Sequence, residues 1–66
     1  MAYEKQHGLR DEMNARFPRR RGNIGQQMFR SCYFNARMHG EGVDEAIASS
    51  VDAVRVHVPG FVPIEL

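Results

Sequence analysis

The sequence predicts a small all-α domain with three helices and an apolar C-terminal tail packed across them. Two observations indicate this fold class. Apolar residues recur at helical spacing in three separate stretches, and Pro18, Gly40 and Pro59 close these stretches in turn. The chain has 66 residues, which corresponds to one small domain (1–66) with a thin core.

The first helix is predicted over residues 2–17. Its apolar stripe at helical spacing consists of Ala2, Leu9, Met13 and Phe17. Pro18 disfavours helical geometry in the residue before it, so the helix should end at Phe17. Gly8 lowers helix stability by about 1 kcal/mol relative to alanine, so we expect the first turns to fray.

The second helix is predicted over residues 24–39 and begins with a capping-box pattern. Asn23 should accept a hydrogen bond from a backbone N–H of the first turn, and Gln26 should reach back to the start of the helix. One side of the helix carries Gly25, Met28, Phe29, Cys32, Tyr33 and Ala36, and another carries Ile24, Phe34 and Met38. Two apolar sides are typical of the central helix of a domain, or of a helix that also meets another subunit. Gly40 should end this helix.

The third helix is predicted over residues 43–57. Its apolar residues at helical spacing are Val43, Ile47, Val51, Val54 and Val58. Asp44 and Glu45 lie in the first turn, where the helix dipole favours negative charge. Because β-branched valines also alternate with polar residues near its end, a short extended segment at 53–58 is the alternative.

The last residues are too apolar for a free chain end. Pro59, Gly60 and Pro63 interrupt regular structure, whereas Phe61 and Ile64 need cover. We expect this tail to lie across the helices or to reach a neighbouring molecule.

Composition disfavours several classes of protein. The single cysteine, Cys32, cannot form an internal disulfide, which favours a reducing compartment. No apolar run approaches the roughly 18 residues of a membrane span, and the first residues lack the apolar core of a signal peptide. We therefore expect a cytoplasmic protein that does not enter a membrane.

The formal net charge of +1 hides a division of charge along the chain. Residues 1–40 contain eight Lys or Arg against three acids, whereas residues 41–66 contain one Arg against five acids. Such a dipolar molecule suits a nucleic-acid face, head-to-tail self-association or the docking of a complementary protein.

Arginines dominate the predicted binding surface. Arg19, Arg20 and Arg21 lie in a loop that opens onto the start of the second helix, where free N–H groups and the dipole favour anions. Polar residues at spacings of four, three and four continue this surface along the helix: Gln26, Arg30, Tyr33 and Arg37. These seven residues form the predicted partner-binding set, and a solvated basic face is the alternative.

No catalytic, metal or cofactor site is predicted. Cys32 and His39 are seven residues apart, which is about 10 Å along a helix and too far for one zinc ion to bridge. No nucleophile stands beside a plausible base. A helix-turn-helix is disfavoured because the third helix would present Asp44, Glu45 and Asp52 to DNA phosphates.

The sequence thus predicts a non-enzymatic interaction protein, of the adaptor or inhibitor type, that binds an acidic protein partner through the arginine-rich loop and the central helix. It also predicts homo-oligomerisation through Ile24, Phe34, Met38, Phe61 and Ile64, because these apolar residues exceed what one thin core can cover. The alternative function is a small nucleic-acid-binding regulator that contacts phosphates. Its contact residues would be Arg19–Arg21, Arg30 and Arg37.

Overall fold

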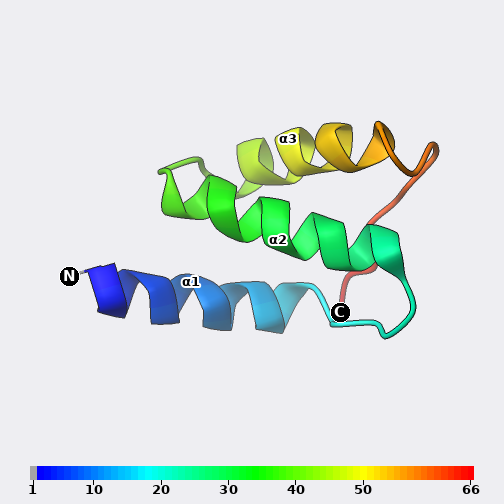
Figure 1. Cartoon of the computed structure of the whole chain (residues 1–66). Helices are drawn as coiled ribbons and strands as arrows, with labels where there is room; N and C mark the ends of the chain where they lie inside the picture. Colours follow the sequence, from blue (N-terminus) through cyan, green and yellow to red (C-terminus); the bar gives the residue numbers. More distant parts are fainter. Residues whose placement is uncertain (1) are drawn as a thin grey trace.

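The computed structural model describes residues 2–66 and confirms the predicted all-α class (Figure 1). Its helices are α1 (Ala2–Arg16), α2 (Ile24–Met38) and α3 (Val43–Arg55). Each ends within two residues of the predicted boundary. The extended alternative at 53–58 is wrong, because α3 continues to Arg55 and Val56 keeps helical dihedral angles of −61° and −34°.

Helix α2 is the central element, as its two apolar sides predict. It lies between α1 and α3 and packs against both (Figure 1). Its end is also as predicted, because Gly40 has a φ of +95°, a left-handed conformation that suits glycine at a helix C-terminus.

The core is built around aromatic rings from α2 and its neighbours. Phe17, Phe29 and Tyr33 are fully buried. The ring of Phe17 meets those of Phe29 and Tyr33 edge-on, at centroid distances of 4.7 and 5.0 Å. Helix α3 contributes Ala46 and Val54 to the same cluster. Each fully buried side chain of this size contributes about 1.5 to 3 kcal/mol of hydrophobic stabilisation.

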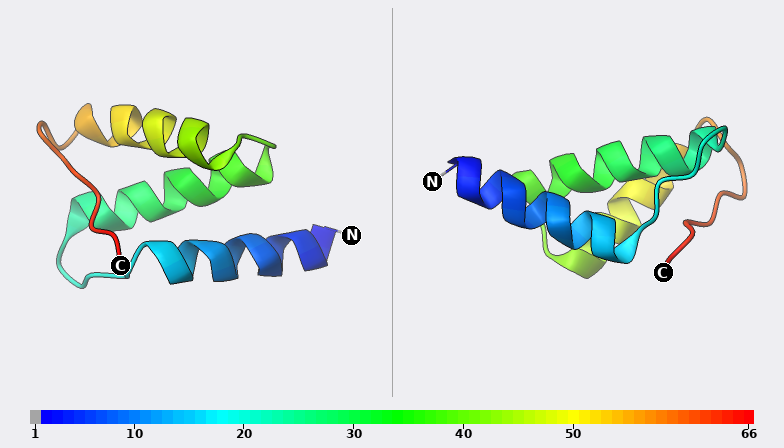
Figure 2. Two further views of the ribbon diagram at one scale, coloured as in Figure 1. Left: turned by 180° about the vertical axis from the view of Figure 1, so that it is seen from behind. Right: turned by 90° about the horizontal axis from the view of Figure 1, so that it is seen from below.

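Only the second half of α1 belongs to this core. Met13 is buried, Leu9 is half-buried and Phe17, just after the helix, is fully buried, whereas residues 3–8 are all exposed. The first turns of α1 extend beyond the end of α2 (Figure 2). The predicted apolar stripe therefore holds from Leu9 onward, and the side chain of Ala2 lies outside the described part of the structure.

The start of α2 confirms one half of the predicted capping box. The side chain of Asn23 accepts a hydrogen bond from the backbone N–H of Gln26 at 2.9 Å. The other half is wrong, because the Gln26 side chain does not return to the helix start. Its amide nitrogen donates to the carbonyl oxygens of Pro18 and Ile64, and its oxygen accepts the N–H of Ile64, all within 2.9 to 3.0 Å.

The C-terminal tail crosses the N-terminal end of α2, as predicted. Phe61 is buried against Phe29, and its ring lies so close to Gly25 that a Cβ atom there would come within 2.6 Å of it. The last residue reaches α1, because the N–H of Leu66 donates to the carbonyl of Arg16 at 2.9 Å. The tail therefore completes the core and joins the ends of two helices.

We expect Gln26→Ala to lower the free energy of unfolding by about 2 to 3 kcal/mol, because it removes three hydrogen bonds to buried or half-buried backbone groups. The neighbouring exposed residue provides the matched control, and Gln27→Ala should change the same quantity by less than about 0.5 kcal/mol. Urea denaturation of the two variants measures both values. Equal losses would show that Gln26 does not hold the tail.

Candidate functional site

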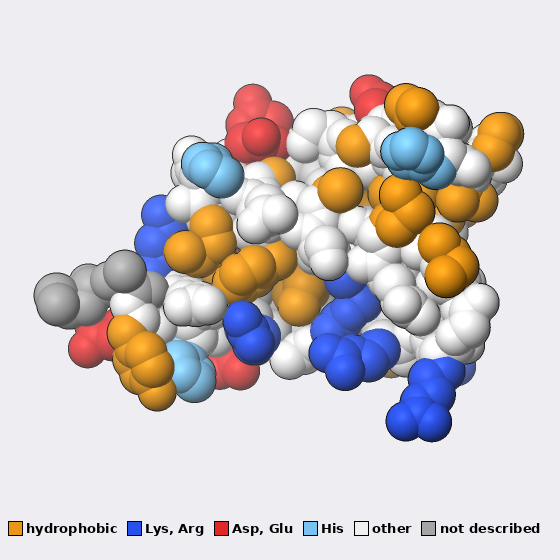
Figure 3. All heavy atoms as spheres, viewed as in Figure 1, with side chains coloured by type: hydrophobic (Ala, Val, Ile, Leu, Met, Phe, Trp, Pro, Cys, Tyr) orange, Lys and Arg blue, Asp and Glu red, His pale blue; other side chains and the backbone are white. Residues whose placement is uncertain are grey.

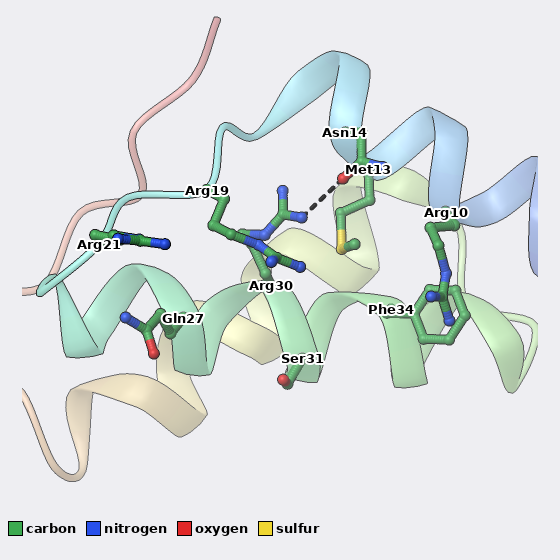
Figure 4. A pocket seen from close by; sticks show the side chains of 9 residues that line it. All are labelled: Arg10, Met13, Asn14, Arg19, Arg21, Gln27, Arg30, Ser31 and Phe34. Atoms are coloured by element: carbon green, nitrogen blue, oxygen red, sulfur yellow. Dashed lines mark hydrogen bonds between the residues drawn. The ribbon is translucent and has the colours of Figure 1, made fainter.

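An open groove of about 510 Å³ runs between α1 and α2, with α3 behind α2 (Figure 4). We call it the arginine groove. Its lining comes from three segments: Arg10, Met13 and Asn14 of α1, Arg19 and Arg21 of the connecting loop, and Gln27, Arg30, Ser31 and Phe34 of α2.

The groove is strongly basic. Four of its lining side chains are arginines, and none of the lining residues is acidic. Figure 3 shows acidic side chains over α3 and along α1, and basic side chains gathered near the loop that joins α1 to α2. The groove therefore carries a local positive potential, which favours anions.

Arg30 is the most buried charged residue in the groove, with 8% of its surface exposed. Its guanidinium donates to the carbonyl oxygen of Phe17 and, at 2.7 Å, to Oδ1 of Asn14. Burial lowers the pKa of Arg30, and the nearby charge of Arg19 lowers it further. The group stays charged at neutral pH, because an arginine pKa lies far above that range.

Arg10 and Phe34 form the end of the groove away from the loop (Figure 4). The guanidinium carbon of Arg10 lies 5.2 Å from the centre of the Phe34 ring, a cation–π contact. Phe34 also packs against the core cluster and is only half-exposed. One face of the only aromatic ring in the groove lining is thus covered.

Tyr33 and Arg37 belong to a separate cluster that joins α2 to α1. Arg37 binds both carboxylate oxygens of Glu12, at 3.0 and 2.8 Å, and the Tyr33 hydroxyl donates to the same carboxylate. The hydrogen bond from Arg37 is the main cause of the lowered pKa of Glu12. Burial, followed by the hydrogen bond to Glu12, raises the pKa of Tyr33 to about 12.

The structure brings together three of the seven predicted partner-binding residues. Arg19, Arg21 and Arg30 line the groove, whereas Arg20 is exposed but does not line it. The predicted continuous polar edge along α2 is wrong. Gln26 and Tyr33 are fully buried, and Arg37 is bound to Glu12. The polar groups of these three side chains therefore already form hydrogen bonds within the molecule.

Sequence reasoning missed most of the groove wall formed by α2. Gln27, Arg30, Ser31 and Phe34 follow positions i, i+3, i+4 and i+7, which is one helical face. Helical periodicity predicts these four groove residues when the polar face is taken to begin at Gln27, and it predicts the wrong set when the face is taken to begin at Gln26. Arg10 and Asn14 had no comparable signal, because their relation to α2 depends on how the two helices cross.

The predicted oligomer interface is only partly exposed. Ile24 has 61% of its surface exposed, Phe34, Met38 and Ile64 are half-buried, and Phe61 belongs to the core. The prediction that Phe61 lies at an interface is therefore corrected, because its ring packs against Gly25 and Phe29.

We expect Glu12→Gln to lower the free energy of unfolding at neutral pH by about 1 to 2 kcal/mol, because it weakens the charge-assisted hydrogen bonds from Arg37. The lowered pKa of Glu12 means that its contribution is present above the unfolded value of about 4.5 and is lost as pH falls through the folded value. The stability difference from wild type should therefore narrow in acid. Asp11→Asn, an exposed neighbour, is the control, and a difference that stays constant from neutral pH to pH 3 would contradict the assignment.

Self-association stays a prediction, and Ile24 is the residue that tests it. We expect Ile24→Glu to convert an oligomer into a monomer, because it places a charge in the exposed apolar position. Size-exclusion chromatography with light scattering measures the mass. Val56→Glu changes a similarly exposed valine and serves as the control. A monomeric wild-type protein at high micromolar concentration would refute the prediction.

Among residues 2–66, no helix combines the length and the apolar character needed to cross a membrane. Comparisons with protein-family models, curated proteins and solved structures gave no match to this chain.

Proposed function

We propose that this chain is a small non-enzymatic interaction protein, of the adaptor or inhibitor type, that binds an extended acidic segment of a partner protein in the arginine groove. One observation carries the proposal. Four arginines from α1, the loop and α2 converge on a single groove whose lining contains no acidic side chain. Arginine is well suited to such a site because its planar fork of donors matches a carboxylate.

The dimensions of the groove fit a short stretch of extended chain. Gln27 and Phe34 are seven residues apart on α2, which corresponds to about 10 Å along the helix axis. An extended segment rises about 3.3 Å per residue, so about three residues would lie along this wall. The lining also contains two apolar residues, the half-buried Phe34 and the largely buried Met13, which suits a segment that carries apolar side chains beside its acidic ones.

Two features favour a protein partner over nucleic acid. Proteins that bind single strands offer aromatic faces on which bases stack, and Arg10 covers a face of Phe34, the one aromatic residue that lines the groove. Arg37, one of the phosphate contacts in the nucleic-acid alternative, is already paired with Glu12. Of the other proposed phosphate contacts, Arg19, Arg21 and Arg30 line the groove, whereas Arg20 lies outside it.

The test uses a fluorescent pool of octapeptides that carry alternating acidic and apolar residues. We expect the wild-type protein to bind these peptides near physiological salt. Arg19→Ala and Arg21→Ala should each lower the affinity by about fivefold to tenfold. Arg20→Ala is the matched control, because it removes the same charge from the same loop without changing the groove lining. It should alter the affinity by less than about twofold.

Three results would overturn the proposal. An equal loss in the Arg20→Ala variant would show that overall charge, and not the groove, determines binding. Tighter binding of mixed-sequence DNA or RNA, with log affinity falling by about 0.7 to 0.9 per phosphate contact against log salt, would establish the nucleic-acid alternative. No binding by any peptide in the pool would also reject an acidic segment as the ligand.

A further inference from the structure

Arg30 carries a buried positive charge that is not paired with a carboxylate within residues 2–66. The two ion pairs of the described structure involve Arg16 and Arg37. The groups that hold Arg30, a backbone carbonyl and the amide oxygen of Asn14, are both neutral. A buried cation without a counter-charge is unfavourable. An anion bound beside Arg30 would therefore gain more binding free energy than an anion bound to a solvated side chain.

The guanidinium of Arg30 is also held in place before any ligand arrives. The two hydrogen bonds use two of its five N–H donors, and the others remain for a ligand. Because the side chain is already ordered, binding loses little of its conformational entropy. Arg30 is therefore the rigid part of the groove.

Arg19 places a second positive charge beside the first. Its guanidinium lies next to that of Arg30 in the space between α1 and α2 (Figure 4). The two positive charges repel each other, which lowers the pKa of Arg30. A carboxylate would bring one negative charge and two acceptor oxygens to this pair. A phosphomonoester brings a charge of about −1.5 to −2 and three acceptor oxygens. The phosphomonoester therefore matches the combined charge of the two guanidinium groups more closely than a carboxylate does, and it offers one more acceptor oxygen.

We infer that the centre of the arginine groove, at Arg19 and Arg30, is a subsite for the phosphate group of a phosphorylated residue in the partner's acidic segment. This inference depends on the proposed function and names its ligand chemistry. Arg10 and Arg21 lie toward the two ends of the groove (Figure 4), where they face acidic residues on either side of the phosphorylated one. Recognition of phosphorylated segments by arginine clusters is a recurrent binding mode.

The experiment compares three fluorescent octapeptides that differ only at one central position, which is phosphoserine, glutamate or serine, with alternating acidic and apolar flanks. At neutral pH we expect the phosphoserine peptide to bind at least about tenfold more tightly than the glutamate peptide. This advantage should shrink at about pH 5, because the second phosphate pKa is about 6 and the group then loses a charge. Inorganic phosphate should compete with the phosphoserine peptide.

Two variants locate the subsite. Arg19 is exposed, so Arg19→Ala should leave thermal stability unchanged and should remove the preference for phosphoserine. Arg20→Ala, which changes the same loop outside the groove, should retain this preference. Arg30→Lys keeps the charge but loses the planar fork, and it should reduce the preference if the variant remains folded.

The outcomes separate this inference from the proposed function. Equal affinity for the glutamate and phosphoserine peptides, or a preference that survives Arg19→Ala, overturns the phosphate subsite while the acidic-segment function stands. Failure of all three peptides to bind rejects both. An oligonucleotide that binds more tightly than every peptide, and loses affinity in the Arg19→Ala variant, assigns the phosphate to nucleic acid and overturns the peptide assignment.

Discussion

The buried side chain of Gln26 is the contact on which the rest of the molecule depends. It binds the carbonyl of Pro18 on one side and both backbone groups of Ile64 on the other, so it fastens the loop and the tail to α2 at one point. Arg30, one helical turn further along, binds the carbonyl of Phe17. Two α2 side chains thus hold consecutive carbonyls at the end of α1, immediately before Arg19. The position of the groove's loop arginines follows from this attachment.

Two arginines of α2 show how the neighbouring helix determines the use of a charge. Arg37 meets Glu12 of α1, and the bidentate pair is neutralised within the molecule. Arg30, two turns earlier, meets the neutral Asn14 instead, so two of its N–H donors are hydrogen-bonded but its charge is not paired. Arginine therefore stabilises the α1–α2 packing at Arg37, whereas at Arg30 it leaves an unpaired positive charge that would attract an anion. Neighbouring residues of α1 create this difference.

The fold was predictable to a large extent because its signals are local. Pro18 and Gly40 act on the backbone beside them, and Asn23 binds an N–H three residues away, so helix boundaries follow from short stretches. The apolar spacing of α2 also predicted its central position. The alternating valines near Val56 left an extended alternative open, and helical packing prevailed over it. Residues 3–8 are helical as predicted, but they extend beyond the rest of the molecule and are exposed.

The candidate site was predictable only in part. The cluster of arginines and its location at the start of the second helix are properties of the chain order, and they were visible without a structure. Whether Gln26 or Gln27 faces solvent, and whether Arg30 or Arg37 is neutralised, could not be decided in that way. Helical spacing gives the angular position of each side chain, but its burial and its partners come from segments far away in sequence. Gln26 and Ile64, 38 residues apart, meet only because the apolar tail folds back across α2.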